Sequence, residues 1–215
     1  MNQTRIEWTD RTVNPVVGCT HKCKYCYAPS FAKRQGLKGC CYDFFPHPHL
    51  ERLDKIKPTQ KPKKIFIDSM WDWNCKDNKQ AWLTAIIKKF RECPQHTFQI
   101  LSKKPKGYKR YKFPKNVWIG TTITSNTDAH KVDQLVSSNS KNIKFVSVEP
   151  IQGNIDHDLS GMDWIIIGPE TGNRKGKIIP KKVWIKNLIS FGKKHNIPVF
   201  IKDKANWPKV IQDFP

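Results

Sequence analysis

Long apolar runs are absent from this 215-residue sequence. Because no stretch of about 18 apolar residues occurs, no transmembrane helix is expected. The first ten residues, MNQTRIEWTD, are polar and contain no apolar core of a secretory signal. Internal repeats and low-complexity tails are also absent. We therefore expect a single domain over residues 1–215, in the cytoplasm, with reduced thiols and no membrane partner.

Acidic residues are scarce: 18 Asp and Glu stand against 39 Lys and Arg, which gives a formal net charge of +21. A positive field of this size attracts polyanions, so nucleic acid is the partner that the charge suggests. The alternative is a lysine-rich coding bias with no binding role. The net charge indicates non-specific affinity for polyanions and does not identify any reaction that the protein catalyses.

Three of the seven cysteines, Cys19, Cys23 and Cys26, follow a C-x3-C-x2-C pattern. Three thiolates on one loop are able to hold three irons of a cubic iron–sulfur cluster, which usually takes four cysteine ligands. The missing fourth ligand leaves one iron open to a substrate or cofactor. The spacing also allows a structural zinc site, with His21 inside the loop as a further ligand. A disulfide framework is typical of small secreted chains and suits this sequence less well.

The other four cysteines follow no common ligand spacing, and we interpret them as buried or free thiols: Cys40, Cys41, Cys75 and Cys93. His47 and His49 lie beside prolines in an irregular segment, 36–62. They are candidate ligands, although histidines in such loops are mostly solvated.

Short apolar runs alternate with helical or loop segments along most of the chain. Apolar runs of this kind are typical of parallel strands buried on both faces. Helices are expected over 27–35, over about 15 residues from Asp77, over 127–137 and over 183–195. After a first short strand within residues 5–18, the runs are 65–67, 97–101, 117–123, 144–148, 164–167 and 198–201. This order predicts an α/β fold with about six to seven parallel strands.

Polar or charged residues follow the carboxyl ends of most of the expected strands. In a β/α barrel that end carries the active site. An open, doubly wound sheet is the rival architecture, and it also places sites at strand ends. We favour a partial or irregular (β/α) barrel because the candidate residues come from so many strands: Cys19, Asp68, Ser69, Lys103, Thr122, Glu149, Glu170 and Lys202.

The cysteine loop closely resembles that of the radical S-adenosylmethionine (radical SAM) superfamily. Further segments resemble a phage-associated family of small, uncharacterised radical SAM-like proteins, and the resemblance runs from residue 5 to residue 207. The segments are IEWTD (6–10), NPVVGC (14–19), IFIDSM (65–70), HTFQILSK (96–103), NVWIG (116–120), FVSVEP (145–150) and DWIIIG (163–168).

The resemblance implies a 4Fe–4S cluster on Cys19, Cys23 and Cys26, with S-adenosylmethionine chelated at the open iron. An electron from the cluster then cleaves the sulfonium to give a 5′-deoxyadenosyl radical, so a reducing electron donor is also required. Tyr25 is the aromatic residue that would lie against the adenine. Asp68 and Ser69 stand where the superfamily has a glycine-rich segment that meets the methionine amino group.

Further cofactor-binding residues are expected at other strand ends. Gly168 and Glu170 belong to a segment that resembles the apolar-glycine motif supporting the adenine. Ser102, Lys103, Thr122 and Glu149 are expected to hold ribose hydroxyls or the carboxylate by charge and hydrogen bonds. For Lys103 and Glu149, the alternative is a mutual ion pair at the barrel rim. The sequence assigns no catalytic residue.

The sequence therefore predicts a radical SAM enzyme that abstracts hydrogen from an unidentified substrate, with nucleic acid as the candidate raised by the charge. Base or sugar modification and photoproduct repair are the candidate reactions. Two alternatives belong to other classes of protein. One is a non-catalytic basic iron–sulfur or zinc module that binds nucleic acid or a partner protein. The other is an iron–sulfur redox sensor.

Overall fold

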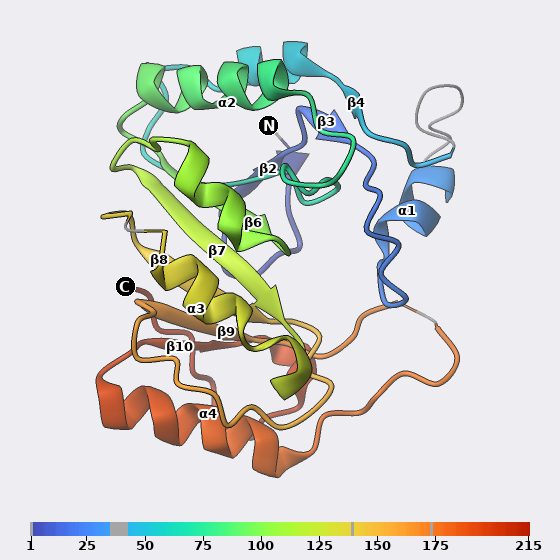
Figure 1. Cartoon of the computed structure of the whole chain (residues 1–215), viewed down its shortest axis with the longest axis vertical. Helices are drawn as coiled ribbons and strands as arrows, with labels where there is room; N and C mark the ends of the chain where they lie inside the picture. Colours follow the sequence, from blue (N-terminus) through green and yellow to red (C-terminus); the bar gives the residue numbers. More distant parts are fainter. Residues whose placement is uncertain (1, 35–42, 139, 173) are drawn as a thin grey trace. The chain divides into compact units, whose positions relative to one another are not determined.

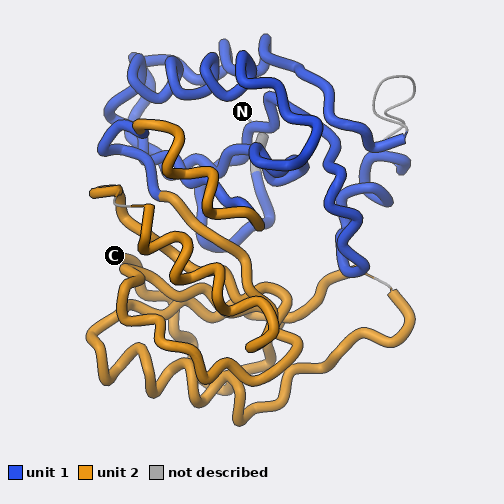
Figure 2. Tube along the Cα trace, viewed as in Figure 1, with its two compact units in different colours: residues 1–102, 113–118 blue, residues 103–112, 119–215 orange. Residues whose placement is uncertain are grey.

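The computed structural model describes residues 2–34, 43–138, 140–172 and 174–215 (Figure 1). The chain divides into two compact units, which are residues 1–102 with 113–118 and residues 103–112 with 119–215 (Figure 2). Cys40 and Cys41 lie outside the described residues. A single domain over residues 1–215 stays a prediction.

The first unit contains three parallel strands and one antiparallel edge strand. Strand β2 pairs in parallel with β5, and β5 with β6, so that Thr12 lies beside Phe66 and Phe66 beside Gln99. A separate pair is formed by β3 (Val16–Val17) and β4 (His47–Pro48), which run antiparallel. The sheet strands are β1 (Asn2–Gln3), β2 (Arg11–Val13), β5 (Lys64–Ile67) and β6 (Thr97–Ser102), with β1 antiparallel to β2.

Helix α2 (Gln80–Glu92) covers this unit's apolar core with one face. The expected helical spacing is confirmed, because Trp82, Leu83, Ile86, Ile87 and Phe90 are all buried. The Phe90 ring lies 4.4 Å from that of Phe98 in β6, measured between centroids. The other helical segments here are α1 (Ala28–Arg34) and the 3₁₀ helix η1 (Leu50–Lys55).

The second unit is built on strands that are buried almost throughout. Strand β7 (Val117–Ile123) begins in the first unit and, from Ile119 onward, belongs to the second. It pairs in parallel with β8 (Lys144–Val148), which pairs with β9 (Trp164–Ile167) and then β10 (Val199–Ile201). The helical segments are α3 (Lys131–Val136), α4 (Lys182–His195), η2 (Pro105–Arg110), η3 (Asn126–Asp128) and η4 (Asp203–Ala205).

The predicted α/β class is confirmed: about six to seven parallel strands were expected and the described residues form seven, of which β7, β8 and β9 have the predicted bounds. The prediction of one continuous helix over 127–137 is wrong. Ser125 and Asp128 form a capping box around a short 3₁₀ turn, so the α-helix begins only at Lys131. The segment predicted to be irregular contains β4 and η1. Among the described helices, none combines the length and apolarity needed to cross a membrane.

Candidate functional site

The cysteine loop starts at Gly18, directly after β3. Gly18 has φ of 105°, and a Cβ at this position would overlap the carbonyl of Phe45. The Gly18 amide donates to the Met70 carbonyl at 3.0 Å, and the Cys19 amide donates to the Phe44 carbonyl at 2.9 Å. The loop therefore leaves β3 between two other segments, where only glycine fits.

The three loop cysteines form no disulfide, and each is of intermediate exposure. Cys19 and Cys26 pack against a small apolar cluster that includes Val17 and Met70. In the described part of the chain, no three His, Cys, Asp or Glu side chains are grouped to hold a metal ion. A zinc ion needs all its ligands at about 2.0–2.3 Å from one point. Cysteines of an iron–sulfur cluster instead bind different irons and stay further apart.

Residues 68–70 are hydrogen-bonded to the cysteine loop and to the turn that precedes it. The Ser69 hydroxyl and the Met70 amide both donate to Asn14 Oδ1, at 3.1 and 3.2 Å. The Tyr27 hydroxyl donates to the Ser69 carbonyl at 3.1 Å. With the bond from Gly18 to Met70, these contacts fix the end of β5 against the loop.

Asp68 is the buried carboxyl of this segment, and its backbone has φ of 66°. The Val16 amide donates to the carboxyl, but Oδ1 has no hydrogen-bond partner among the described residues. Burial raises the pKa of Asp68 well above its usual value, the Val16 hydrogen bond lowers it, and the charge of Asp72 raises it further. A buried acceptor without a protein partner is uncommon, and a water, an ion or a ligand donor is able to complete it.

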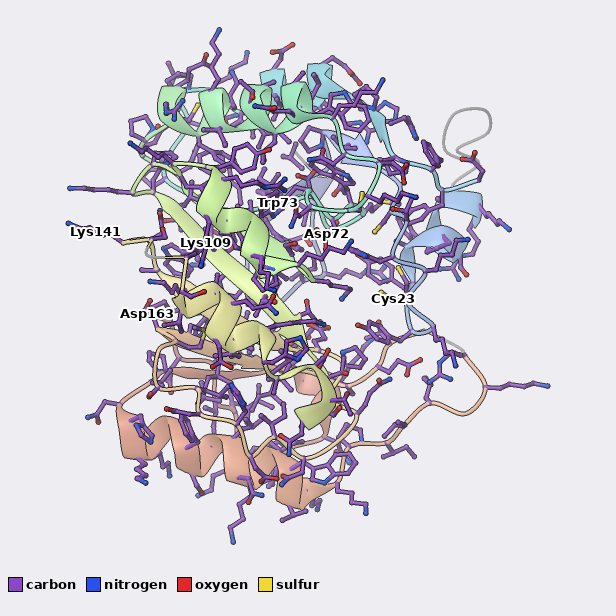
Figure 3. The ribbon with its side chains drawn as sticks, viewed as in Figure 1. Cys23, Asp72, Trp73, Lys109, Lys141 and Asp163 are labelled. Atoms are coloured by element: carbon purple, nitrogen blue, oxygen red, sulfur yellow. The ribbon has the colours of Figure 1, made fainter. Side chains whose placement is uncertain are left out.

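Asp72 connects the loop to the end of β6. Its Oδ2 lies 3.0 Å from His21 Nε2, and its Oδ1 accepts from the Ser102 hydroxyl at 2.8 Å and the Asn74 amide at 2.9 Å. Figure 3 labels Asp72 together with Cys23 of the loop. Ser102, expected to meet the cofactor, thus bonds Asp72. Sequence reasoning missed Asp72, whose only signal is a polar residue soon after a strand.

Cys75 is in contact with Cys19, although its sequence position suggested an isolated thiol. The hydrogen bond between the two sulfurs is the largest cause that lowers the pKa of Cys75, to about 6, and Thr20 donors act in the same direction. The same bond raises the pKa of Cys19, and burial raises it further. Cys93 is also buried, and its thiol donates to the Ile56 carbonyl at 3.8 Å.

In the second unit, two predicted site residues lie together at the ends of β8 and β9. Glu149 Oε1 lies 2.6 Å from Lys202 Nζ. A Cβ on Gly168 would lie 2.9 Å from Lys202 Cδ and 3.1 Å from Glu149 Cδ, so the glycine leaves room for this ion pair. Lys202, which follows β10, therefore provides the ion-pair partner that the sequence analysis sought in Lys103.

Glu170 is bound from two sides in the same unit. Arg174 donates through Nε and Nη2 to the two carboxylate oxygens, at 2.6 and 2.7 Å, and Gln152 donates at 3.3 Å. The hydrogen bonds from Arg174 are the largest cause that lowers the pKa of Glu170. This geometry positions the segment after β9.

The remaining candidates have separate positions. Thr122 is buried in β7, Tyr25 is half-buried in the cysteine loop, and Lys103 follows β6. Their cofactor-binding roles stay predictions, as do those of the other candidates. His47 and His49, considered as ligands, bond each other through Nε2 at 2.9 Å.

The fold is similar to that of solved structures of spore photoproduct lyase, a radical SAM enzyme. In its complex with dinucleoside spore photoproduct, the match has a TM-score of 0.62 at 10% identity and covers 93% of this chain and 78% of the lyase. A double mutant of the lyase with bound AdoMet and dinucleoside spore photoproduct matches with a TM-score of 0.61 at 9% identity and the same coverage. No curated protein sequence matches the chain.

These matches define the class of fold, which is the α/β partial barrel of the radical SAM type. The expected barrel is thereby preferred over the doubly wound sheet. A family model covers residues 3–213, and the chain belongs to that family, which is described as a protein of unknown function (DUF5131). The family description carries nothing on the phage association that the resemblance implied.

Proposed function

We propose that this protein is a radical SAM enzyme, with a 4Fe–4S cluster on Cys19, Cys23 and Cys26 and S-adenosylmethionine bound beside it. When bound, these groups supply the reductive cleavage that yields a 5′-deoxyadenosyl radical for hydrogen abstraction. The donor set fits, because three cysteines that form no disulfide share one loop, and a cubic cluster takes its protein ligands from cysteine thiolates.

The observation that carries the proposal is that Asp68 Oδ1 is buried and has no hydrogen-bond partner among the described residues. This buried carboxylate lies in the segment that is hydrogen-bonded to the cysteine loop. The methionine part of S-adenosylmethionine has an ammonium group, which donates charge-assisted hydrogen bonds. In this role Asp68 binds the ammonium through Oδ1, and the added positive charge lowers the raised pKa of the carboxyl again.

Asp72 acts on the loop rather than on the cofactor. It accepts hydrogen bonds from Ser102 and Asn74 and holds the ring of His21, which stands between Cys19 and Cys23 in the sequence. Tyr25 supplies an aromatic face for the adenine. Tyr25 and Asp68 are the residues proposed to bind and orient the cofactor, and the cofactor-binding roles expected for Glu149 and Gly168 stay predictions.

Nucleic acid is the proposed class of substrate, with a base or sugar as the hydrogen donor. The formal charge of +21 supports it, since phosphate contacts supply most non-specific affinity. The similar lyase structure is a complex with a dinucleoside photoproduct. A cytoplasmic location and a protein or small-molecule reductant complete the proposal.

Anaerobic reconstitution with iron and sulfide, followed by dithionite and S-adenosylmethionine, tests the reaction. We expect the parent chain to form 5′-deoxyadenosine, measured by chromatography. Cys19→Ala, Cys23→Ala and Cys26→Ala are each expected to lose the cluster iron, because a cube held by two cysteines is unstable. Cys93→Ala is the matched control and keeps its iron. Bound metal without cleavage would instead support the non-catalytic module.

Asp68→Asn tests the assigned ammonium site separately. It keeps the side-chain shape and removes the charge, so we expect the Kd for S-adenosylmethionine to rise about tenfold or more. Iron content stays at the parent level. The control is Asp54→Asn, at an exposed position of the same unit. Equilibrium dialysis gives both constants, and an unchanged Kd would reject the role of Asp68.

A further inference from the structure

The segment 174–182, here called the basic loop, lies between β9 and α4 and ends at the first residue of α4 (Figure 1). Its sequence, RKGKIIPKK, contains five cations and no acidic residue. The sequence has no Asp or Glu between Glu170 and Asp203. The loop is therefore a local concentration of positive charge.

Apolar side chains are exposed in the middle of this charge. Ile179 is 84% exposed and Ile178 is 41% exposed, and Pro180 follows them. Single exposed apolar residues are common on proteins. Two neighbouring isoleucines flanked by Lys177 and Lys181 are a different arrangement. The lysines attract a polyanion to this surface, where the exposed isoleucines are available to be buried against it.

Hydrogen bonds hold the first half of the loop, and a cation–π contact holds its other end. Arg174 is fixed by its two bonds to the buried Glu170, and Lys177 Nζ donates to the Gly172 carbonyl at 2.6 Å. The Lys181 ammonium lies 5.5 Å from the centroid of the Trp184 ring. An ordered loop loses less conformational entropy when it binds, so the exposed isoleucines are presented in a defined position.

Cations beside an aliphatic wedge fit double-helical nucleic acid. Isoleucine and proline are among the side chains that insert between base pairs, unstack them and bend the duplex. Single-strand binding relies instead on exposed aromatic faces. Residues 174–183 contain no aromatic ring, and the Trp184 ring is half-buried with Lys181 over it.

We infer that the basic loop docks on duplex nucleic acid, with its lysines on the phosphates and Ile179 inserted between adjacent base pairs. The inference rests on the proposed function for its substrate class and adds the surface that engages it. An enzyme that reacts with a base in a duplex must take that base out of the stack. Insertion of Ile179 fills part of the space that unstacking opens.

Fluorescence anisotropy with the full chain and a labelled duplex of about 25 base pairs tests the docking. Ile179→Ser is expected to raise the Kd about tenfold, because the buried apolar contact is lost. The matched control is Val210→Ser, which removes an apolar side chain that is 83% exposed elsewhere in the same unit. It should change the Kd by less than about twofold. Equal effects of the two variants would overturn the inference.

Two more measurements separate the contribution of Ile179 from that of the lysines. Energy transfer between dyes on the duplex ends should report bending by the parent chain and its loss in Ile179→Ser. Replacing Lys175 and Lys182 together by Gln should reduce the salt slope of log Kd by about two. The control replaces Lys193 and Lys194, at the other end of α4, and leaves the slope unchanged.

A straight duplex with the parent chain would overturn the wedge. Ile179-dependent binding to phosphatidylserine vesicles, with duplex affinity independent of Ile179, would overturn the duplex assignment in favour of a membrane. The formation of 5′-deoxyadenosine without nucleic acid tests the enzyme proposal alone. The two proposals therefore fail in different assays.

Discussion

The carboxyl groups near the strand ends of the two units differ in how fully their oxygens are bonded: Asp72 of the first unit is bonded through both oxygens, but Asp68 is not. In the first unit, Asp68 keeps one oxygen without a hydrogen-bond partner among the described residues. In the second unit, Glu149 has Lys202 and Glu170 has Arg174, each at about the shortest distance that an ion pair allows. Paired groups hold segments in place, whereas a buried acceptor without a protein partner lowers stability unless water or a ligand completes it.

Substitution of the two glycines with positive φ gives the largest expected effect on stability. Gly18 and Gly172 both have positive φ, of 105° and 87°. A Cβ on Gly18 meets the Phe45 carbonyl, while one on Gly172 has nothing within 4 Å. We expect Gly18→Ala to lower the free energy of unfolding by about 3 kcal/mol or more. Gly172→Ala should lower it by about 1–2 kcal/mol, from backbone conformation alone.

Urea unfolding followed by circular dichroism measures both changes. Iron content after reconstitution should fall only in Gly18→Ala, because only that substitution displaces the cysteine loop. Equal losses of stability in the two variants would show that the loop relaxes around the added methyl group, and that its tight exit from β3 is unimportant.

The paired carboxylate of the second unit gives an intermediate effect. Glu170 has a side chain that is 1% exposed, and Arg174 is 35% exposed. Glu170→Gln should therefore destabilise by about 2 kcal/mol, less than a fully buried pair would. The pKa of Glu170 is lowered in the folded protein, so its contribution is complete above the unfolded pKa and is lost as the pH falls through the folded one.

The difference in melting temperature between parent and Glu170→Gln should thus shrink in acid. A double-mutant cycle of Glu170→Gln, Arg174→Gln and the double variant isolates the interaction energy of the pair. If the two single changes simply add, Arg174 does not stabilise Glu170, and the basic loop is held by other contacts.

Substitution of Asp68, whose Oδ1 has no hydrogen-bond partner among the described residues, gives the smallest effect on stability, and the sign of that effect is reversed. The pKa of Asp68 is raised in the folded protein, so its contribution is largest below the unfolded pKa and is lost as the pH rises through the folded one. Asp68→Asn removes this penalty and should stabilise the cofactor-free chain by about 1 kcal/mol near pH 8. The gain in melting temperature should decrease towards pH 4.

A stabilised variant that binds S-adenosylmethionine less well is the combination expected of a site residue. Loss of stability in Asp68→Asn at pH 8 would mean that the hydrogen bond from Val16 stabilises the carboxylate by more than burial destabilises it. Such a result would make Asp68 resemble Glu170 and remove the contrast between the two units.

Structural features that depend on local sequence patterns were predicted well. Mostly apolar runs gave β7, β8 and β9 their bounds, since strands buried on both faces are rich in apolar residues. Local capping was underestimated: Ser125 and Asp128 interrupt the helix expected over 127–137. The partners of polar groups were not predictable in the same way, because side-chain chemistry alone does not select among many candidates.

The sequence by itself determined the three loop cysteines, because the spacing C-x3-C-x2-C places three thiols on one turn whatever surrounds them. It also determined the excess of positive charge and the run of parallel strands. Only the tertiary structure decided that Asp72 meets His21 from 51 positions away, and that Lys202 meets Glu149 from 53 positions away. Such contacts form when packing brings strand ends together, and no local pattern in the chain encodes which ends will meet.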